Sequence, residues 1–477
     1  MVSLRITLGY GNHVISFATR IVKNSLVKKT IGLISVEVRL VDVVRCFLLF
    51  SILVSPMVLS VSDTRAGVSI KPESYGYFDF PTCVRYALIH SDALTKNRID
   101  IQLASVDLKD AHSEILPTLQ VATTYYLAQT VNIYNPTATP WSVQFQMVNW
   151  NPYLAILKIK TKSIMVDIAK TSHLDKISDT TANIAKIFYG IHALEKSIRG
   201  SKQILALSQD KLNFGRSKND QGRIDPLELQ GLQNDFRSQQ IKVKSLENEL
   251  EEKVSQLKAI IGYHPDYHLP LDTRDAANQI LNGFKPNWIA FADVQGGNLQ
   301  LKISAKKEQM QSNAVTGAYV AIVPQPMLVF EQDANVPNAA SGLNLGIGLN
   351  YMLWDGFKRV RDIKRQKLLA HKYNLDREEL SQQLYLKFKK LKSGMGLSSE
   401  KESLSREQAK LADLAEEKAL IGYKSGQIEY SKYMDQRIKK TQAHLDAATS
   451  LQPRVNDLID LATITGGLNK YNAAIRY

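Results

Sequence analysis

The segment Tyr263–His268 contains residue types that bind metal ions, namely two histidines and an aspartate. His264 and His268 are four residues apart, a spacing that places two ligands on one face of a helix. Pro265 follows His264 directly and prevents the helix that this geometry requires. The pattern therefore favours a surface loop, and we expect no metal-binding site.

A second candidate is the glycine-rich segment Ser341–Gly348, because closely spaced glycines occur in phosphate-binding loops. The lysine and the helix start that accompany such loops are missing here. The side chains instead alternate between apolar and small or polar types, which is typical of a strand. No Ser/His/Asp or Cys/His set stands on convergent elements. We therefore predict no catalytic residues, no cofactor and no enzymatic activity.

The formal net charge of +14 would suit a nucleic-acid partner if the basic residues were clustered. Residues 1–66 carry eight basic and three acidic residues, so the start of the chain accounts for part of the excess. In the rest of the chain both signs of charge are mixed along expected helices, as in Lys242–Lys258. Such mixing is typical of solvated helix faces. A nucleic-acid partner is therefore not expected.

An apolar run of 16 residues, 46–61, follows Arg45. A helix needs about 20 apolar residues to span a bilayer, so the run is short for a membrane anchor. Small residues follow, with candidate cleavage sites after Ser62 or Ala66. We predict an N-terminal extension and signal peptide at 1–66, with a short anchor or a buried helix as the alternatives. Its removal would leave Cys83 without a partner for an intrachain disulfide.

The remainder of the chain repeats itself at nearly fixed offsets. Three pairs of residues in similar local sequence are 204 positions apart: Trp150 and Trp354, Gly222 and Gly426, and Gly262 and Gly466. Two pairs upstream are 207 positions apart: Ser91 and Asn298, and Pro117 and Pro324. Such self-similarity indicates duplicated structural units. We predict a first repeat at 67–262, a connector at 263–286, a second repeat at 287–466 and a C-terminal tail at 467–477.

Each repeat is predicted to contain a helix, two strands, a long helix and a return helix. In the first repeat, residues 82–115 form a helix, and alternating side chains predict strands at 119–127 and 141–147. Residues 153–214 contain no proline, and a helix of that length measures roughly 90 Å. The chain then turns at Gly222–Pro226 into the return helix.

The second repeat follows the same order. A helix at 287–322 precedes strands at 326–331 and 343–351, and a long helix at 357–421 carries leucines seven residues apart. The chain turns at Gly422–Gly426, and a last helix closes the repeat. The clearest strand has apolar residues on one face and small or polar residues on the other. Its predicted barrel positions are Leu343, Leu345, Ile347, Leu349 and Tyr351.

Four strands per chain are too few to cross a membrane alone. In lipid, the edges of an open sheet would leave N–H and C=O groups without hydrogen bonds. Three copies would supply twelve strands, enough to close a barrel around a lumen. The long helices also need partners for their apolar seams. We therefore predict a mainly α fold with a small transmembrane β part, in which coiled-coil hairpins continue a 12-stranded barrel as a helical tunnel in a homotrimer.

The arrangement resembles the TolC family of outer-membrane efflux proteins over roughly residues 80–470. The resemblance rests on YALIHSDAL at 86–94, ILPTL at 115–119, GRIDPLELQ at 222–230, LNYMLWDGF at 349–357 and GYKSGQIEY at 422–430. It implies a homotrimer in the cell outer membrane, with a periplasmic tunnel whose coiled tip docks an adaptor protein. It also implies the function of an exit duct in a tripartite efflux pump or type I secretion system, driven by an inner-membrane pump of the RND or ABC type.

The resemblance further implies a gate, where links between hairpins close the inner end of the tunnel. Alignment on the tip glycines, Gly222 and Gly426, places Tyr423 at the family's latch tyrosine and Glu228 at its acidic partner. Ile428 stands at the position of the family's latch arginine, which is a departure from the pattern. A hydrogen bond between a tyrosine and a carboxylate is chemically reasonable at the latch.

Two residues correspond to the ring of acids at the narrowest point of the family's tunnel. Asp435 matches one ring acid, whereas Lys432 stands where the second acid is found. The ring would therefore be mixed in charge, which argues against a strong preference for cations. An ordinary solvated helix face is the other interpretation of Asp435 and Glu228.

Two other function classes fit parts of the pattern. A periplasmic adaptor also has helical hairpins with heptads, but it has one hairpin and a lipoyl-like β domain. A coiled-coil scaffold without a channel would not need the alternating segments at 119–147 and 343–351. The sequence therefore favours an export duct, in which the choice of cargo lies mostly in the pump.

Overall fold

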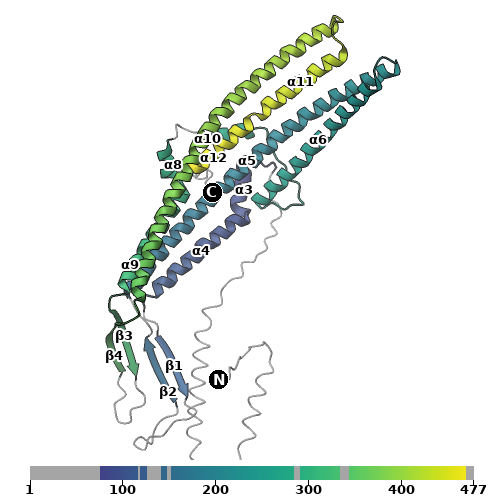
Figure 1. Cartoon of the computed structure of the whole chain (residues 1–477). Coiled ribbons are helices and arrows are strands. Elements are labelled where there is room, and N and C mark those ends of the chain that lie inside the picture. The colour runs from purple at the N-terminus through teal and green to yellow at the C-terminus, as the bar shows by residue number, and fades with distance from the viewer. Residues whose placement is uncertain are drawn as a thin grey trace, which may run out of the picture. The chain divides into compact units, whose positions relative to one another are not determined.

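Two long helical hairpins make up most of the described structure. The computed structural model describes residues 76–116, 119–125, 141–147, 152–283, 290–332 and 343–468, all within one compact unit, Tyr75–Tyr477. The first hairpin pairs α5 (Pro152–Asp220) with α6 (Pro226–Ile261), and the second pairs α10 (Lys358–Lys424) with α11 (Tyr430–Thr449) and α12 (Leu451–Ile464) (Figure 1). The 69 residues of α5 span roughly 100 Å. The predicted signal peptide at 1–66 lies outside the described residues.

The helix before the strands is interrupted in both repeats. The four resulting helices are α3 (Phe80–His90), α4 (Asp92–Ser113), α8 (Phe291–Gly297) and α9 (Leu299–Val320). The breaks fall at Ser91 and Asn298, and both residues have extended backbones. The Asn298 side chain accepts from the Leu301 N–H (3.0 Å) and donates to the Ile464 carbonyl (3.0 Å), so it satisfies groups on both sides of the break. The prediction of continuous helices at 82–115 and 287–322 is therefore wrong at these two residues.

The last helix is also divided, into α11 and α12, at Ser450. Pro453 lies in the first turn of α12 and has no backbone N–H to donate to the carbonyl of Thr449. The hydroxyls of Thr449 and Ser450 instead donate to carbonyls in the last turn of α11. The connector contains a helix that periodicity did not predict, α7 (Ala276–Gly283), which packs against α3 and α5. The element order otherwise follows the predicted one.

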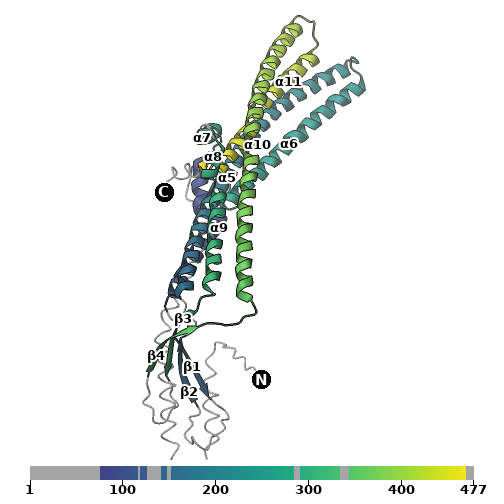
Figure 2. The ribbon, with the colours of Figure 1, turned by 60° about the vertical axis from the view of Figure 1, so that its left-hand side comes forward.

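The helices lie side by side in a single row. In the half that contains α4 and α9, the order is α4, α5, α9 and α10. In the half that contains the hairpin tips, the order is α6, α5, α11 and α10 (Figures 1 and 2). Helix α10 therefore forms one edge in both halves, and α4 and α6 form the other. Among the described helices, none combines the length and the apolar character that a bilayer crossing demands.

Two apolar clusters hold the row together where the short helices pack on the hairpins. The larger joins α3, α5, α6, α7 and α12, and the smaller joins α8, α10 and α12. Residues related by the repeat offsets occupy equivalent places in the two clusters: Ala87 and Val294, Ile184 and Phe388, and Leu257 and Leu461. The two repeats therefore bury corresponding faces of corresponding helices.

The four strands in the described part of the chain form two antiparallel hairpins. Strand β1 (Leu119–Tyr125) pairs with β2 (Trp141–Met147), and β3 (Gln325–Gln332) pairs with β4 (Leu343–Asn350). Strand β2 lies beside β3, so β1 and β4 are the outer strands among the described residues. The observed strands end within two residues of their predicted ends, and Tyr351 lies one residue past the end of β4. The mainly α character is confirmed, and the described residues contain strands in the four predicted places.

Glycine is required where each return helix ends against the helix break of its own repeat. Gly262 caps α6 with a φ of +76°, and a Cβ there would overlap the carbonyl oxygen of His90. In the second repeat the glycine stands at the helix break and not at the end of the return helix. A Cβ at Gly297 would overlap the carbonyl oxygen of Thr465, which follows α12. Backbone atoms therefore make this contact in both repeats, which leaves little room for adjustment.

Replacing Gly262 with alanine is expected to destabilise the protein more than the same change at Gly222. Both glycines have positive φ, +76° and +67°, which costs alanine about 1 kcal/mol or more. Nothing lies within 4 Å of a Cβ added at Gly222, whereas a Cβ at Gly262 meets the His90 backbone. We expect the extra loss of unfolding free energy for Gly262→Ala to be about 2 kcal/mol, measured by denaturant unfolding followed by circular dichroism. Equal losses for the two variants would contradict the backbone contact.

Candidate functional site

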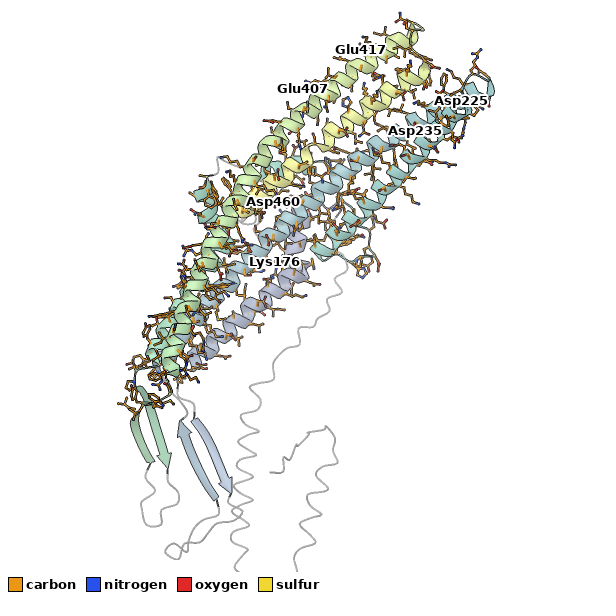
Figure 3. The ribbon with its side chains drawn as sticks, in the orientation of Figure 1. Lys176, Asp225, Asp235, Glu407, Glu417 and Asp460 are labelled. Carbon is orange, nitrogen blue, oxygen red and sulfur yellow. The ribbon has the colours of Figure 1, made fainter. Side chains whose placement is uncertain are left out.

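The candidate site is the pair of hairpin tips, and the first tip joins α5 to α6. Gly222 has a φ of +67°, and the Arg223 N–H donates to the Lys218 carbonyl (2.9 Å) to close the end of α5. The Asp225 side chain accepts from the Leu227 N–H (3.0 Å) and caps α6. Figure 3 shows Asp225 at the end of this hairpin. The glycine and the capping aspartate together make the chain reverse within a few residues.

The second tip, between α10 and α11, is built around the repeat-related glycine. Gly426 has a φ of +76°, and the N–H groups of Gln427 and Ile428 both donate to the Gly422 carbonyl (2.8 and 3.1 Å). The Ile428 side chain lies against Gly422, where a Cβ would meet it at 2.6 Å. The isoleucine that stands at the family's latch arginine therefore packs inside its own turn.

Three contacts join the two hairpins near their tips. They are the ion pair Lys211–Asp435 (Nζ–Oδ1 2.6 Å), the ion pair Lys218–Glu429, and the ring contact Phe214–Tyr430 with centroids 4.7 Å apart. The three residues on α5 are separated by three and four positions, so they share one face of the helix. The second hairpin is therefore fastened to the first within a single chain.

Three tyrosines form a cluster on the second hairpin. Tyr423 stacks on Tyr433 with centroids 5.5 Å apart and an interplanar angle of 5°, and it also contacts Tyr430. The Tyr433 hydroxyl donates to Glu416 on α10 (3.3 Å), and the Arg437 guanidinium lies over the Tyr433 ring. Burial and, to a smaller extent, Glu416 raise the pKa of Tyr433, so the phenol remains a hydrogen-bond donor at neutral pH.

A carboxylate on α10 clamps the next turns of α11. Asp413 contacts His444 Nε2 (2.8 Å) and Lys440 Nζ (3.2 Å), and Lys440 also contacts Glu416 (3.6 Å). The hydrogen bonds from His444 and then Lys440 hold the pKa of Asp413 below its ordinary value. The clamp therefore acts only while Asp413 is ionised.

The structure places the four predicted gate residues in different settings. Asp435 lies in the ion pair with Lys211, and Tyr423 lies in the tyrosine cluster. Glu228 is exposed in the first turn of α6, and Lys432 is exposed on α11. In the part of the single chain that the structure describes, no hydrogen bond joins Tyr423 to Glu228, whose helices belong to different hairpins.

Sequence reasoning missed the α5 side of these contacts. The spacing of Lys211, Phe214 and Lys218 was a usable signal, because residues three and four apart on a long helix form one face. Their partners lie three to nine residues after the second turn glycine, at Glu429, Tyr430 and Asp435. Nothing in the local sequence says that these two segments meet, since they are separated by about half of the chain.

The described residues contain no group of three or more His, Cys, Asp or Glu side chains placed to hold a metal ion. The segment Tyr263–His268 forms a loop in which residues 264–268 are exposed. His264 packs its ring on Tyr267 with centroids 4.8 Å apart. The prediction of a surface loop is confirmed here.

No protein-family model and no curated protein matches the sequence. Solved structures are similar in fold over 81% of the chain. The outer-membrane channel OprN is 13% identical, with a TM-score of 0.68 over 90% of its chain. The CmeC outer-membrane channel of Campylobacter jejuni is 14% identical (TM-score 0.66, 85% covered), and the outer-membrane protein VceC of Vibrio cholerae is 12% identical (TM-score 0.66, 96% covered). The chain therefore has the fold of these outer-membrane channels, and the prediction of a TolC-type fold is confirmed.

Because of the clamp at Asp413, we expect the stability of the second hairpin to fall at acidic pH. The folded-state pKa of Asp413 is depressed, so its stabilising contribution is present above the ordinary pKa of 3.8 and is lost as pH falls through the lower folded value. Asp413→Asn should raise amide hydrogen exchange in residues 405–420 at pH 6, and the difference from the unmodified chain should be clearly smaller at pH 3, because the contribution of Asp413 declines as pH falls below 3.8.

A matched control is Glu417→Gln, which removes a charge from an exposed position on the same helix (Figure 3). This variant should leave hydrogen exchange in residues 405–420 unchanged at both pH values. An Asp413→Asn effect that is equally large at pH 3 and pH 6 would contradict the ionic clamp.

Proposed function

We propose that the chain is the outer-membrane exit duct of a tripartite efflux pump or type I secretion system. The observation that carries this proposal is the fold that the chain shares with outer-membrane channels over 81% of its length. The duct is a passive conduit for solutes or polypeptide, and an inner-membrane pump of the RND or ABC type drives transport. The described residues supply two hairpins and four strands, as such a duct requires.

The proposed assembly is a homotrimer, and the exposed edge of α10 supports it. Six leucines on this helix are between 50% and 65% exposed in the single chain: Leu368, Leu375, Leu386, Leu397, Leu404 and Leu411. Successive members are 7 or 11 residues apart, which is close to a whole number of helical turns, so they lie along one line. An apolar line of this length on an edge helix is a surface for a neighbouring helix.

The opposite edge of the row has an apolar surface of its own. On α4, Ile99, Leu103 and Val106 are each about half exposed and lie on one face. A contact between the α10 edge of one copy and the α4 and α6 edge of the next is heterologous, and such contacts close into a ring when the rotation permits. Three copies closed in this way would form the helical tunnel.

The same closure completes the β part. The outer strands β1 and β4 would pair between neighbouring copies, which removes the open edges that lipid does not tolerate. Three copies then give a 12-stranded barrel in the cell outer membrane, with outer-membrane lipid around it. Its lipid-facing positions are those predicted on β4, Leu343, Leu345, Ile347 and Leu349, with Tyr351 at the strand end.

The hairpin tips are the proposed entrance and docking end. The turns at Gly222 and Gly426 would face a periplasmic adaptor, and the gate would comprise Glu228, Tyr423, Lys432 and Asp435. The Lys211–Asp435 pair supports a role for Asp435, because it ties the second hairpin to the first in the single chain. Opening the entrance would require this pair to break.

Charged residues on the leucine line should prevent assembly. We expect Leu404→Glu together with Leu411→Glu to convert the detergent-solubilised trimer into single chains, because two carboxylates would have to be buried at the contact. The measurement is the mass of the protein particle by light scattering. The control is Ser399→Glu with Ser403→Glu, which adds the same charge at exposed positions off the line and should leave the mass unchanged. A trimer that survives the leucine changes would contradict this contact.

Single-channel conductance in a planar bilayer tests both the duct and its gate. The purified protein should give discrete conductance steps, and Asp435→Ala should raise the mean conductance several-fold because it releases Lys211 and the second hairpin. Asp446→Ala, which removes an exposed carboxylate that accepts a hydrogen bond from Gln442 on the same helix, should not change the steps. No conductance together with a water-soluble particle of one or two chains would favour an adaptor or scaffold instead.

A further inference from the structure

A pocket of about 380 Å³ lies between α5 of the first repeat and α11 of the second. The polar side chains that line it are Lys196, Arg199, Gln203, Lys440, Thr441 and His444. Gly200 and Leu445 form part of its wall, and a Cβ at Gly200 would meet the Leu445 side chain at 3.0 Å. The glycine therefore permits the close approach of the two helices beside the pocket.

The lining of this pocket carries cationic side chains and no carboxylate. Lysines elsewhere on α5 pair with acids of neighbouring helices, as Lys186 does with Asp460 and Lys211 does with Asp435. Lys196 and Arg199 have no ion pair in the described part of the chain. The adjacent Glu195 is engaged elsewhere, because it accepts a hydrogen bond from the Thr273 hydroxyl (2.5 Å). Arg199 Nε donates to the Glu195 backbone carbonyl (3.4 Å). The other guanidinium N–H groups of Arg199 and the Lys196 ammonium therefore remain available to an anion.

The α11 side of the pocket is held in place by the clamp described above. Asp413 and Glu416 contact Lys440, and Asp413 contacts His444, from the side of α10. These contacts hold the Lys440 and His444 side chains in place, while the acids themselves stay outside the pocket lining. The Gln203 amide adds an uncharged hydrogen-bond donor. Charged and neutral donors thus converge on one space from two helices.

The positive charges of Lys196 and Arg199 also affect the pKa of the nearby His192. The pKa of His192 is lowered, chiefly by burial; Lys196 and Arg199 lower it further, whereas Glu195 raises it. The imidazole therefore resists protonation mainly because it is buried, and the two cations act in the same direction.

We propose that this pocket binds a small, multiply charged anion of the phosphate class, such as a diphosphate group. Lys196 and Arg199 would neutralise the charge, Gln203 would donate from the same helix, and Lys440 would donate from α11 on the far side. Since α5 and α11 belong to different repeats, the bound anion joins the two hairpins at a level distant from their tips. The same chemistry is carried by free phosphates and by phosphorylated lipid headgroups.

The test is isothermal titration of inorganic pyrophosphate into the purified full chain in detergent. We expect saturable binding of one pyrophosphate per chain, weakened about tenfold or more by Lys196→Gln with Arg199→Gln. The control, Lys244→Gln with Lys439→Gln, removes the same charge at exposed positions outside the pocket and should bind as the unmodified chain does. Absence of saturable binding, or equal weakening in both double variants, would overturn the proposal.

A second measurement needs no substitution. Lysine acylation followed by mass spectrometry should show that pyrophosphate protects Lys196 while the exposed Lys439 stays reactive. Equal reactivity of Lys196 with and without pyrophosphate would overturn the proposal even if the variants fail to fold. A parallel titration with a soluble short-chain phosphatidic acid identifies the source of the anion. If phosphatidic acid competes with pyrophosphate, the site also accepts lipid headgroups. If it does not compete, the site is specific for free anions.

Discussion

The arrangement of the helices depends on the contact between each return helix and the break in its own repeat. At Gly262 and His90, and again at Gly297 and Thr465, the close atoms belong to the backbone. Side chains can shift rotamers to relieve strain, but two touching backbones cannot. The direction of each long hairpin is therefore set near the apolar clusters, and a small rotation there would move the distant tips by many ångströms. Rigidity at this level is what lets a helix of roughly 100 Å hold a defined position at its end.

The regular elements of the fold were predictable from the sequence, because each has its own period and its own terminator. The turn glycines at 222 and 426 and the alternating strands are local signals, and they are where the sequence placed them. The breaks at Ser91 and Asn298 were not predictable in this way, since the apolar seven-residue spacing continues through Ser91 from Ala87 to Leu94 and beyond. They arise from a contact between segments far apart in the chain. The same holds for the candidate site: the ion pair between Asp435 and Lys211 joins two distant segments, and nothing in the local sequence indicates that they meet.

Ion pairs between neighbouring helices recur along the row. Examples are Asp107–Lys162 between α4 and α5, Lys306–Asp167 between α9 and α5, and Arg377–Glu308 between α10 and α9. Each is partly exposed and contributes little to stability by itself. Their combined effect is on register, because sliding one long helix by a turn would separate several pairs at once. Glu402 on α10 differs in being buried, with a side chain 7% exposed, and it pairs with Arg406 on its own helix and with Arg454 on α12. Removal of Glu402 would therefore disrupt the contact between α10 and α12 more than the loss of an exposed acid would.

The line of exposed leucines on α10 also has a consequence for how the protein is made. In an unassembled protomer the leucine line is exposed to solvent. Other newly made chains could bind it in arrangements that do not lead to a closed ring. In the proposed trimer, a ring of three copies would form only after two successive encounters, so an unassembled protomer would persist much longer when synthesis is slow. The yield of complete rings should then depend on the rate of synthesis more than proportionally. Degradation of orphan protomers, which expose the leucine line, would be the natural means of keeping the membrane free of partial assemblies.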